Sequence, residues 1–455
     1  MTSVAEPTAI AQLHSAFAGR VIVPGDDRYD EARTVFAGGI DRRPAAIVRP
    51  KDAAEVARVV AIARDLGQAL AVRSGGHSGA GHGLVEDGIV VDLRDMRGLE
   101  IDAEARTAWA QTGLSAGEYT NAVGAHGLVT GFGDAASVGI GGITLGGGVG
   151  FLSRLHGLTI DSLLAAEVVT ADGEIREVDA EREPDLFWAI RGGGGNFGVA
   201  TRFKFRLHEV AEVVGGMLML PATPEVLSGF LAEADAAPDE LTAIVNVMPA
   251  PPVPFVPEER HGELVVMALV CYAGSGAEAD RALAPFRSLA TPIADMVEPI
   301  VYPEIYGPEP EDYHPTVALR NVFTDDVDAE GVIERLESAE APMRVVQLRV
   351  LGGAIDRVPV DATAYAHRGE RIMANVVAFY EDPAEMPARA AWVNEVATRL
   401  RTGDGAYVNF LGDEGPDRVR AAYPGATWDR LTEAKATYDP ANLFRSNQNI
   451  PPAAH

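Results

Sequence analysis

A glycine-rich stretch with a histidine at its centre is the part of this chain best suited to chemistry. It reads Val72-Arg-Ser-Gly-Gly-His-Ser-Gly-Ala-Gly-His-Gly83. Successive backbone N–H groups without side chains form a concavity that suits phosphate oxygens. His77 is the nucleophilic side chain in the middle of this stretch. The pattern predicts a loop that approaches a phosphate-bearing ligand closely and holds an imidazole beside it.

The residues before this loop predict a compact β-α-β unit that positions it. An apolar strand is expected at 45–49, and Asp52 with Glu55 has the spacing of a helix-capping box. Valine and isoleucine then recur at helical spacing until Gly67, which ends the helix. A second apolar strand at 69–72 follows, and the glycine loop begins where that strand ends.

Two further glycine clusters, at 138–150 and 192–198, are alternative nucleotide sites. Gly193-Gly-Gly195-Asn-Phe-Gly198 satisfies G-x-G-x-x-G. A Rossmann fingerprint follows a strand and opens a helix, whereas this cluster follows a predicted helix and opens a strand. The cluster at 138–150 lacks the required spacing, and the chain has no P-loop sequence. Nicotinamide and P-loop chemistry are therefore disfavoured.

A metal held by His77 and His82 is another alternative. Structural zinc needs four nitrogen, sulfur or oxygen ligands, and no cysteine or third histidine lies nearby in the sequence. No metal site is predicted, although a purely structural role for His77 stays open. The absence of a G-x-S-x-G sequence also disfavours an α/β-hydrolase nucleophile.

The composition predicts a globular protein with an acidic surface. The 455 residues are 47% hydrophobic and carry a formal net charge of −28. Nucleic acids and anionic membranes bind basic surfaces, so neither is an expected partner. No apolar run reaches the length of a transmembrane helix, and the single cysteine, Cys271, excludes an intrachain disulfide. We expect a cytoplasmic protein, because residues 1–7 lack the features of a signal peptide.

The composition changes near residue 213, where the glycine clusters stop. Apolar strands then alternate with long helical segments, which predicts a broad sheet with helices on one face. The strands are expected at 217–220, 243–248, 264–271, 345–351 and 372–380, and the helices near 223–235, 277–289, 329–340 and 384–402. We therefore divide the chain into a first domain at 1–212, a second at 213–405 and a C-terminal segment at 406–455.

Four motifs, in order, resemble those of one enzyme family. Arg73-Ser-Gly-Gly-His77-Ser78 is similar to the flavin-attachment motif of the vanillyl alcohol oxidase / p-cresol methylhydroxylase superfamily, and most of all to its berberine bridge enzyme-like branch. Residues 138–150 resemble the family's second FAD loop, and residues 185–198 resemble its D-L-F-W-A-x-R-G-G-G-G segment. Residues 438–450 are similar to its C-terminal signature, so the resemblance covers nearly the whole chain.

This resemblance implies an α+β fold with an FAD-binding domain of the p-cresol methylhydroxylase type in two parts. Residues 1–212 would form the first part and 406–455 would complete it. Residues 213–405 would form a substrate-binding domain whose antiparallel sheet is covered by helices. The cofactor would be FAD, bonded through the 8α carbon of its ring to His77. Many relatives have a second bond, to a cysteine, and Ala135 stands at that position here, so a single bond is predicted.

The resemblance also implies further residues at the cofactor. These are Arg73, Ser74, Gly75, Gly76, Ser78, Val138, Gly139, Gly142, Gly146, Gly147, Gly148, Gly150, Val199, Asn409 and Asn447.

The implied activity is that of an FAD-dependent oxidase. A C–H bond next to oxygen or nitrogen in a small organic substrate would give a hydride to flavin N5, and dioxygen would reoxidise the flavin to give hydrogen peroxide. An amine, an alcohol or a secondary metabolite is the expected substrate. A dehydrogenase with another acceptor, a flavin-N5-oxide monooxygenase, a carbohydrate oxidase and a non-catalytic carrier stay open, as does the choice between monomer and homodimer.

The catalytic base is the least defined part of the pattern. Relatives that oxidise sugars or alcohols often carry a tyrosine at the end of Y-x-N-Y, whereas this chain reads Tyr407-Val-Asn409-Phe410. Tyr407 and Asn409 remain as candidates. Asn375 and Arg320, on predicted strands of the substrate domain, are the other polar candidates.

Overall fold

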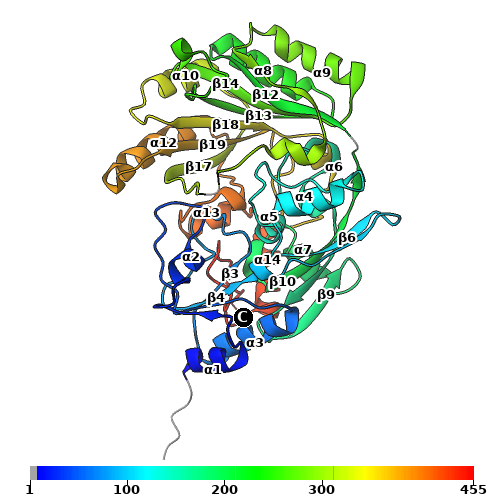
Figure 1. The fold of residues 1–455 in the computed structure, drawn as a ribbon, viewed down its shortest axis with the longest axis vertical. Coiled ribbons are helices and arrows are strands. Elements are labelled where there is room, and N and C mark those ends of the chain that lie inside the picture. Colours follow the sequence, from blue (N-terminus) through cyan, green and yellow to red (C-terminus); the bar gives the residue numbers. More distant parts are fainter. Residues whose placement is uncertain (1–7, 211, 311, 455) are drawn as a thin grey trace, which may run out of the picture.

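The computed structural model describes residues 8–210, 212–310 and 312–454. The N-terminal stretch on which the signal-peptide expectation rests lies outside these ranges. The described chain combines helices with mainly antiparallel sheets, which confirms the α+β prediction. Figure 1 shows two lobes: an N-terminal lobe, built from the first eleven strands and the C-terminal helices, and a central lobe, built from β12–β19 and their helices.

The first sheet of the N-terminal lobe carries the glycine loop. Its strands run in the order β1 (Val21–Ile22), β2 (Ala46–Val48), β4 (Ile89–Asp92), β3 (Leu70–Arg73), and β2, β4 and β3 are parallel. Helix α3 (Ala53–Asp65) connects β2 to β3, as predicted. The Asp52 carboxylate caps it by accepting a bond from the Glu55 N–H at 2.8 Å. Glu55 accepts from the Lys51 N–H, at 2.8 Å, rather than completing the box.

The second sheet is antiparallel and packs on the other side of α3. Its order is β5 (Leu99–Asp102), β6 (Thr107–Gln111), β10 (Val199–Arg206), β8 (Leu163–Val169), β9 (Ile175–Asp179). Val56, Val59 and Val60 of α3 are fully buried in a core shared by both sheets. A short pair of strands, β7 (Leu128–Val129) with β11 (His208–Glu209), lies beside this second sheet. Helices α4 (Ala116–Gly124) and α7 (Pro184–Ala189) pack against the second sheet in a separate hydrophobic core.

The central lobe is one broad antiparallel sheet with helices on one face, as the pattern predicts. Its order is β15 (Ala294–Asp295), β12 (Val213–Pro221), β14 (Leu264–Tyr272), β13 (Leu241–Pro249), β18 (Arg344–Val350), β19 (Ile372–Phe379), β17 (Val317–Thr324), with β16 (Glu298–Ile300) also on β12. The helices on this face are α8 (Pro224–Ala236), α9 (Gly276–Ser288), α10 (Ala329–Glu337) and α12 (Met386–Leu400). The opposite face looks toward the N-terminal lobe (Figure 1).

The C-terminal segment returns to the N-terminal lobe through α13 (Pro416–Ala421) and α14 (Ala426–Tyr438). Lys435 of α14 is fully buried and forms an ion pair with Asp439 at 2.7 Å. Its ammonium also donates to the carbonyls of Asn196, at 2.7 Å, and Phe444, at 2.9 Å. These contacts join the chain end to the third glycine cluster. The domain limits at 212 and 405 themselves stay a prediction.

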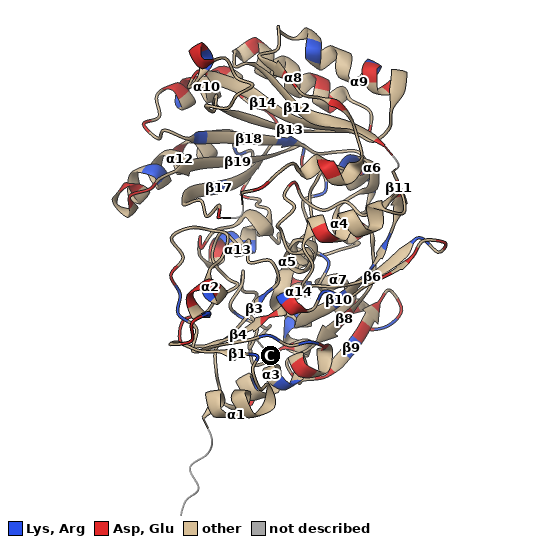
Figure 2. Ribbon diagram, viewed as in Figure 1, with Lys and Arg blue, Asp and Glu red and all other residues tan. Residues whose placement is uncertain are grey.

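The remaining helices are short and connect these layers. They are α1 (Ala9–Ala16), α2 (Tyr29–Arg33), α5 (Ile140–Gly146), α6 (Ser153–His156) and α11 (Ala354–Arg357). Part of the second glycine cluster is thus helical. In the described ranges, no helix is long and apolar enough to cross a membrane. Many of the charged residues lie in the outer helices and loops of both lobes (Figure 2).

Candidate cofactor and substrate site

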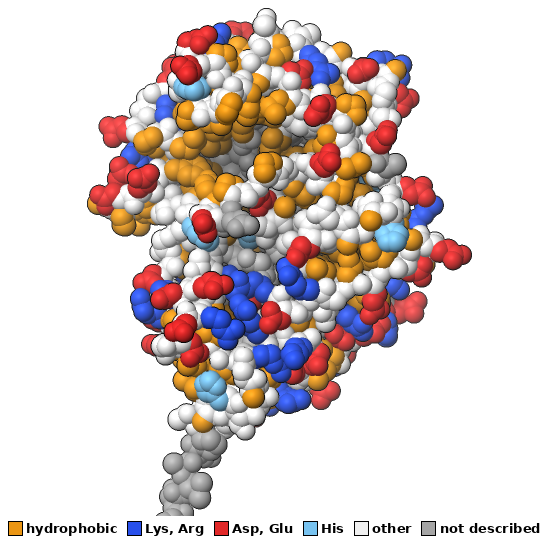
Figure 3. Space-filling view, viewed as in Figure 1, with side chains coloured by type: hydrophobic (Ala, Val, Ile, Leu, Met, Phe, Trp, Pro, Cys, Tyr) orange, Lys and Arg blue, Asp and Glu red, His pale blue; other side chains and the backbone are white. Residues whose placement is uncertain are grey.

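A cavity of about 980 Å³ lies between the two lobes. Figure 3 shows a hollow at this level with hydrophobic side chains around its upper side. The N-terminal lobe contributes the glycine loop after β3 and parts of both other glycine clusters. The central lobe contributes the helix-free face of its sheet and part of α12, and the C-terminal segment contributes residues 407–414, 444 and 446–448. The cavity is large enough for a dinucleotide-sized ligand together with a small molecule.

Two glycine loops form one wall of the cavity because their backbones touch. A Cβ atom on Gly139 would overlap the backbone nitrogen of Gly75, and one on Gly75 would overlap Gly139. Ser74 ties the crossing together: its hydroxyl donates to the Thr112 carbonyl at 2.6 Å and accepts from the Gly141 N–H at 3.2 Å. Only glycine permits this approach, so the two motifs form a single cradle with no side chains between them.

His77 lies in this wall, stacked on Phe36 with a ring-centroid distance of 4.3 Å. Burial is the main cause that lowers the pKa of its imidazole to about 4, although the Glu309 carboxylate acts in the opposite direction. The imidazole is therefore neutral near pH 7 and keeps a nitrogen lone pair. The loop after β3 thus presents a nucleophile to the cavity.

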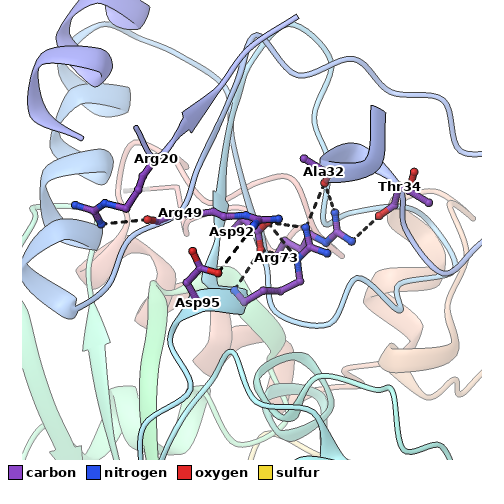
Figure 4. A network of polar contacts seen from close by, with 8 residues as sticks. Arg20, Ala32, Thr34, Arg49, Arg73, Asp92 and Asp95 are labelled. Atoms are coloured by element: carbon purple, nitrogen blue, oxygen red, sulfur yellow. Dashed lines mark hydrogen bonds and ion pairs between the residues drawn. The ribbon is translucent and has the colours of Figure 1, made fainter. Parts of the chain in front are cut away.

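Arg73 fixes the start of the glycine loop to the backbone of a neighbouring segment. Its guanidinium is buried and donates to the backbone carbonyls of Ala32, at 2.6 Å, and Thr34. Figure 4 shows this arginine beside Asp92, a fully buried carboxylate held by Arg49 and Arg94. Burial lowers the pKa of Arg73 to about 10. Arg73 therefore anchors the start of the glycine loop, although it also borders the cavity.

Most residues predicted at the cofactor line this cavity. They are Arg73, Ser74, Gly75, Gly76, His77, Ser78, Val138, Gly139, Gly142, Val199, Asn409 and Asn447. Four predicted glycines are not in the lining and have packing roles instead. A Cβ on Gly146, Gly148 or Gly150 would overlap Asn409, Thr159 or the Phe132 carbonyl, and Gly147 has φ +136°. Close approach to other chain segments accounts for Gly146, Gly148 and Gly150, and the positive φ accounts for Gly147, whereas a contact of these four with the cofactor stays a prediction.

Tyr407 and Asn409 meet where the C-terminal segment crosses the second glycine cluster. The Tyr407 hydroxyl accepts bonds from the Gly148 N–H and the Asn409 side-chain amide, each at 2.8 Å. Burial raises the pKa of this phenol, although both bonds act in the opposite direction. The backbone N–H of Tyr407 donates to Asn321 of β17 at 2.7 Å. Both predicted residues border the cavity.

The sheet face carries polar residues that sequence reasoning missed. Asn246 of β13 and Gln347 and Arg349 of β18 line the cavity beside the predicted Asn375 of β19. Their neighbours Val346, Leu348 and Val350 point into the opposite core. Strict alternation along β18 was a usable signal for Gln347 and Arg349.

Arg320 of β17, also predicted at the site, is not in the cavity lining. It forms an ion pair with Glu414, at 2.6 Å, and Glu414 itself borders the cavity.

The lining fits a flavin nucleotide. The glycine cradle leaves open space at Gly142 and Gly195, where a Cβ would meet nothing within 4 Å. The Asn447 side-chain oxygen is buried without a partner among the described residues. Ala135 borders the cavity, whereas Cys271 is fully buried in β14 and burial raises the pKa of its thiol to about 12. In the part of the chain that the structure describes, no cluster of His, Cys, Asp or Glu could hold a metal ion.

Comparison with known proteins identifies the family. Residues 44–179 match the model of an FAD binding domain, and residues 406–451 match the berberine and berberine-like model. The chain is 32% identical to the uncharacterized FAD-linked oxidoreductase YvdP of Bacillus subtilis, over 96% of this chain and 98% of the relative. It is 29% identical to the (R)-6-hydroxynicotine oxidase of Paenarthrobacter nicotinovorans, over 95% and 97%.

A solved structure agrees with these relatives. The chain superposes on 6-hydroxy-D-nicotine oxidase from Arthrobacter nicotinovorans with a TM-score of 0.86 at 27% identity, over 96% of this chain and 98% of that one. The two glycine loops that form the cavity wall lie within the residues that match the FAD binding domain model. The chain therefore belongs to the berberine bridge enzyme-like FAD-linked oxidoreductases, with an FAD-binding domain of the p-cresol methylhydroxylase type.

Proposed function

We propose that this oxidoreductase is an oxidase that holds FAD through one covalent bond to His77 and oxidises a small organic molecule in the cavity. The observation that carries the proposal is the buried imidazole in the glycine wall, whose pKa is lowered to about 4. A neutral imidazole has the lone pair that bonding to the 8α carbon requires. Relatives named as oxidases support the oxidase assignment.

The glycine cradle would hold the nucleotide, and the face of the central sheet would hold the substrate. Bound FAD would accept a hydride at N5 from a C–H next to oxygen or nitrogen and pass the electrons to dioxygen, giving hydrogen peroxide. The chain itself would orient the substrate and exclude water between the lobes. Dioxygen and a small molecule are thus the proposed partners, and a cytoplasmic monomer or homodimer stays a prediction.

A single bond is proposed because Ala135 borders the cavity and has no thiol. Cys271 is no substitute, since it lies in β14, is fully buried and has a raised thiol pKa. The flavin of this protein would depend on His77 alone for covalent retention.

Tyr407 is the proposed group that handles the substrate proton. Its oxygen accepts two N–H bonds, which favour a negative oxygen, whereas burial favours the neutral phenol. Asn409 would orient that hydroxyl, and Asn375 would contact the substrate from the sheet. Arg320 touches Glu414, so any part it has in catalysis would pass through that carboxylate.

Peptide mass spectrometry tests the attachment. A tryptic digest of the holoenzyme is expected to carry the flavin on the peptide that contains His77, and His77→Ala is expected to release all flavin on denaturation. His82→Ala is the matched control, because His82 also borders the cavity with its pKa lowered to about 4 by burial. Flavin on no His77 peptide would refute the proposal, and peroxide formed with substrate would separate oxidase from dehydrogenase.

A further inference from the structure

A network of side-chain amides and one guanidinium crosses the cavity face of the central sheet. Arg349 donates to the Gln347 oxygen from Nε at 3.1 Å and from Nη2 at 2.9 Å. The Gln347 amide nitrogen donates to the Asn246 oxygen at 3.0 Å. Asn375 also donates to the Gln347 oxygen, at 3.1 Å. These four residues come from three adjacent strands, β13, β18 and β19.

Arg349 sets the direction of every hydrogen bond in this network. A guanidinium has donors only, so Gln347 must turn its oxygen toward Arg349 and its nitrogen toward Asn246. Asn375 must then turn its nitrogen to Gln347 and its oxygen to Asn321, which donates to it at 2.7 Å. The orientation of each amide therefore follows from one arginine, without ambiguity between oxygen and nitrogen.

The network uses its acceptors more fully than its donors. The Gln347 oxygen accepts three bonds, whereas the Gln347 and Asn375 nitrogens each donate one of their two hydrogens to a described residue. Arg349 is only 4% exposed, and its Nη1 has no partner among the described residues. One carboxylate, Asp134, offsets its charge at 2.7 Å from Nη2. The face is therefore rich in unused N–H groups.

The surroundings of this network are apolar. The Arg349 guanidinium lies over the Phe410 ring, 5.2 Å from its centroid. Phe410 has no hydroxyl, so it adds no hydrogen-bonding group to this wall. The other hydrophobic side chains of the cavity from the same sheet are Val317, Ala318, Leu319, Val345, Val377 and Phe379.

We propose that Arg349 and Gln347 select a substrate with an apolar body and an acceptor oxygen, namely a carbonyl or a carboxylate. Such an oxygen satisfies the unused N–H groups, and the hydrophobic walls hold the rest of the molecule. On this sheet face a cationic amine is disfavoured relative to an acceptor oxygen, since the Gln347 oxygen already accepts three bonds and Asp134 is paired with Arg349. This inference rests on the proposed function, because it places the substrate in the same cavity.

Binding of three aromatic probes to the holoenzyme tests the inference. Acetophenone presents a neutral carbonyl, benzoate a carboxylate and benzylamine a cation on similar rings. Isothermal calorimetry is expected to give at least tenfold tighter binding of acetophenone or benzoate than of benzylamine. The oxygen probe that binds more tightly shows whether the site prefers a carbonyl or a carboxylate. Equal or tighter binding of benzylamine would overturn the inference.

Gln347→Glu is expected to change the preference rather than only weaken binding. The second carboxylate oxygen would face Asn246 and the cavity, adding an acceptor and a negative charge where an N–H now lies. Benzylamine should bind at least tenfold more tightly than to the wild type, and benzoate more weakly. A gain in affinity cannot come from unfolding. Gln111→Glu is the control, because it adds the same charge on β6, outside the cavity.

Arg349→Lys keeps the charge but removes the planar fork that orients Gln347. Acetophenone and benzoate should each lose at least fivefold in affinity, whereas Arg344→Lys, on the same strand but bonded to the Leu336 and Ala341 carbonyls, should leave both unchanged. Unchanged affinities for the three probes in both Gln347→Glu and Arg349→Lys would refute the inference. The flavin peptide, measured in the same samples, bears on the proposed function alone.

Discussion

Three buried histidines are expected to make the stability of this protein depend on pH. Burial lowers the pKa values of His77, His82 and His208 to about 4. His208 is held by Ser162, at 2.9 Å, and stacks on His156. His208 does not border the cavity, so it reports on stability separately from cofactor attachment.

The stability of the fold is expected to fall as the pH falls from about 6.5 to about 4. A histidine with a depressed folded pKa binds its proton more weakly than in the unfolded chain, so its stabilising contribution is complete above the unfolded value and is lost on acidification. Each such group accounts for about 1–3 kcal/mol. Urea unfolding of the holoenzyme at pH 7 and pH 4.5 measures this loss.

His208→Gln should reduce that loss, since glutamine takes up no proton. The same change at the exposed His126 is the control. A loss of stability in His208→Gln equal to that of the wild type would contradict the assignment.

At the scale of elements, the crossing of two glycine segments matters more than either motif alone. The loop after β3 and the start of α5 touch backbone to backbone at Gly75 and Gly139. Neither contact can be relieved by rotating a side chain, because the clashing atoms are main-chain atoms. The structure of the wall that carries His77 therefore depends on this crossing.

Gly139→Ala is expected to lower the free energy of unfolding by about 3 kcal/mol and to reduce flavin attachment at least tenfold. The added methyl group would push α5 away from the loop after β3 and displace the cradle. Thermal unfolding and the flavin-to-protein absorbance ratio measure the two effects. Gly369→Ala, where a Cβ would meet nothing within 4 Å, should change neither. Full flavin content in Gly139→Ala would show that the crossing is not needed for attachment.

At the scale of the whole molecule, the end of the chain completes the lobe in which it starts. The buried Lys435 joins α14, the third glycine cluster and the turn around Phe444. Asp439 also accepts from the backbone N–H groups of Leu443 and Phe444, each at 2.8 Å. Burial lowers the pKa of Lys435, with Asp439 acting in the opposite direction. This pair holds together segments that lie more than half the chain apart.

Lys435→Met is expected to cost about 3–5 kcal/mol, because it leaves the Asp439 carboxylate buried without its counter-ion. Adding Asp439→Asn should recover part of that loss, and chemical denaturation of the four members of the cycle measures the coupling. Arg430→Met breaks an exposed ion pair from the same helix to Asp185 of α7 and should cost about 1 kcal/mol or less. Equal losses in Lys435→Met and Arg430→Met would contradict the role given to the buried pair.

The sequence by itself determined the family, the α+β class and the histidine at the centre of the loop. Each rests on local order: a glycine motif after an apolar run, or the C-terminal signature after a predicted helix. Helices on one face of the central sheet also followed from local periodicity, because burial of one face imposes a repeat on the residues of each strand and helix. Such features need no knowledge of which distant segments meet.

Only the tertiary structure decided the surroundings of Arg320. Its strand, β17, brings it to Glu414 of the C-terminal segment, outside the cavity lining. The packing role of Gly148 and Gly150 also depends on Thr159 and Phe132. These outcomes depend on contacts between residues far apart in the chain. A local sequence pattern does not specify such contacts, because they form only when distant segments pack together in the folded protein.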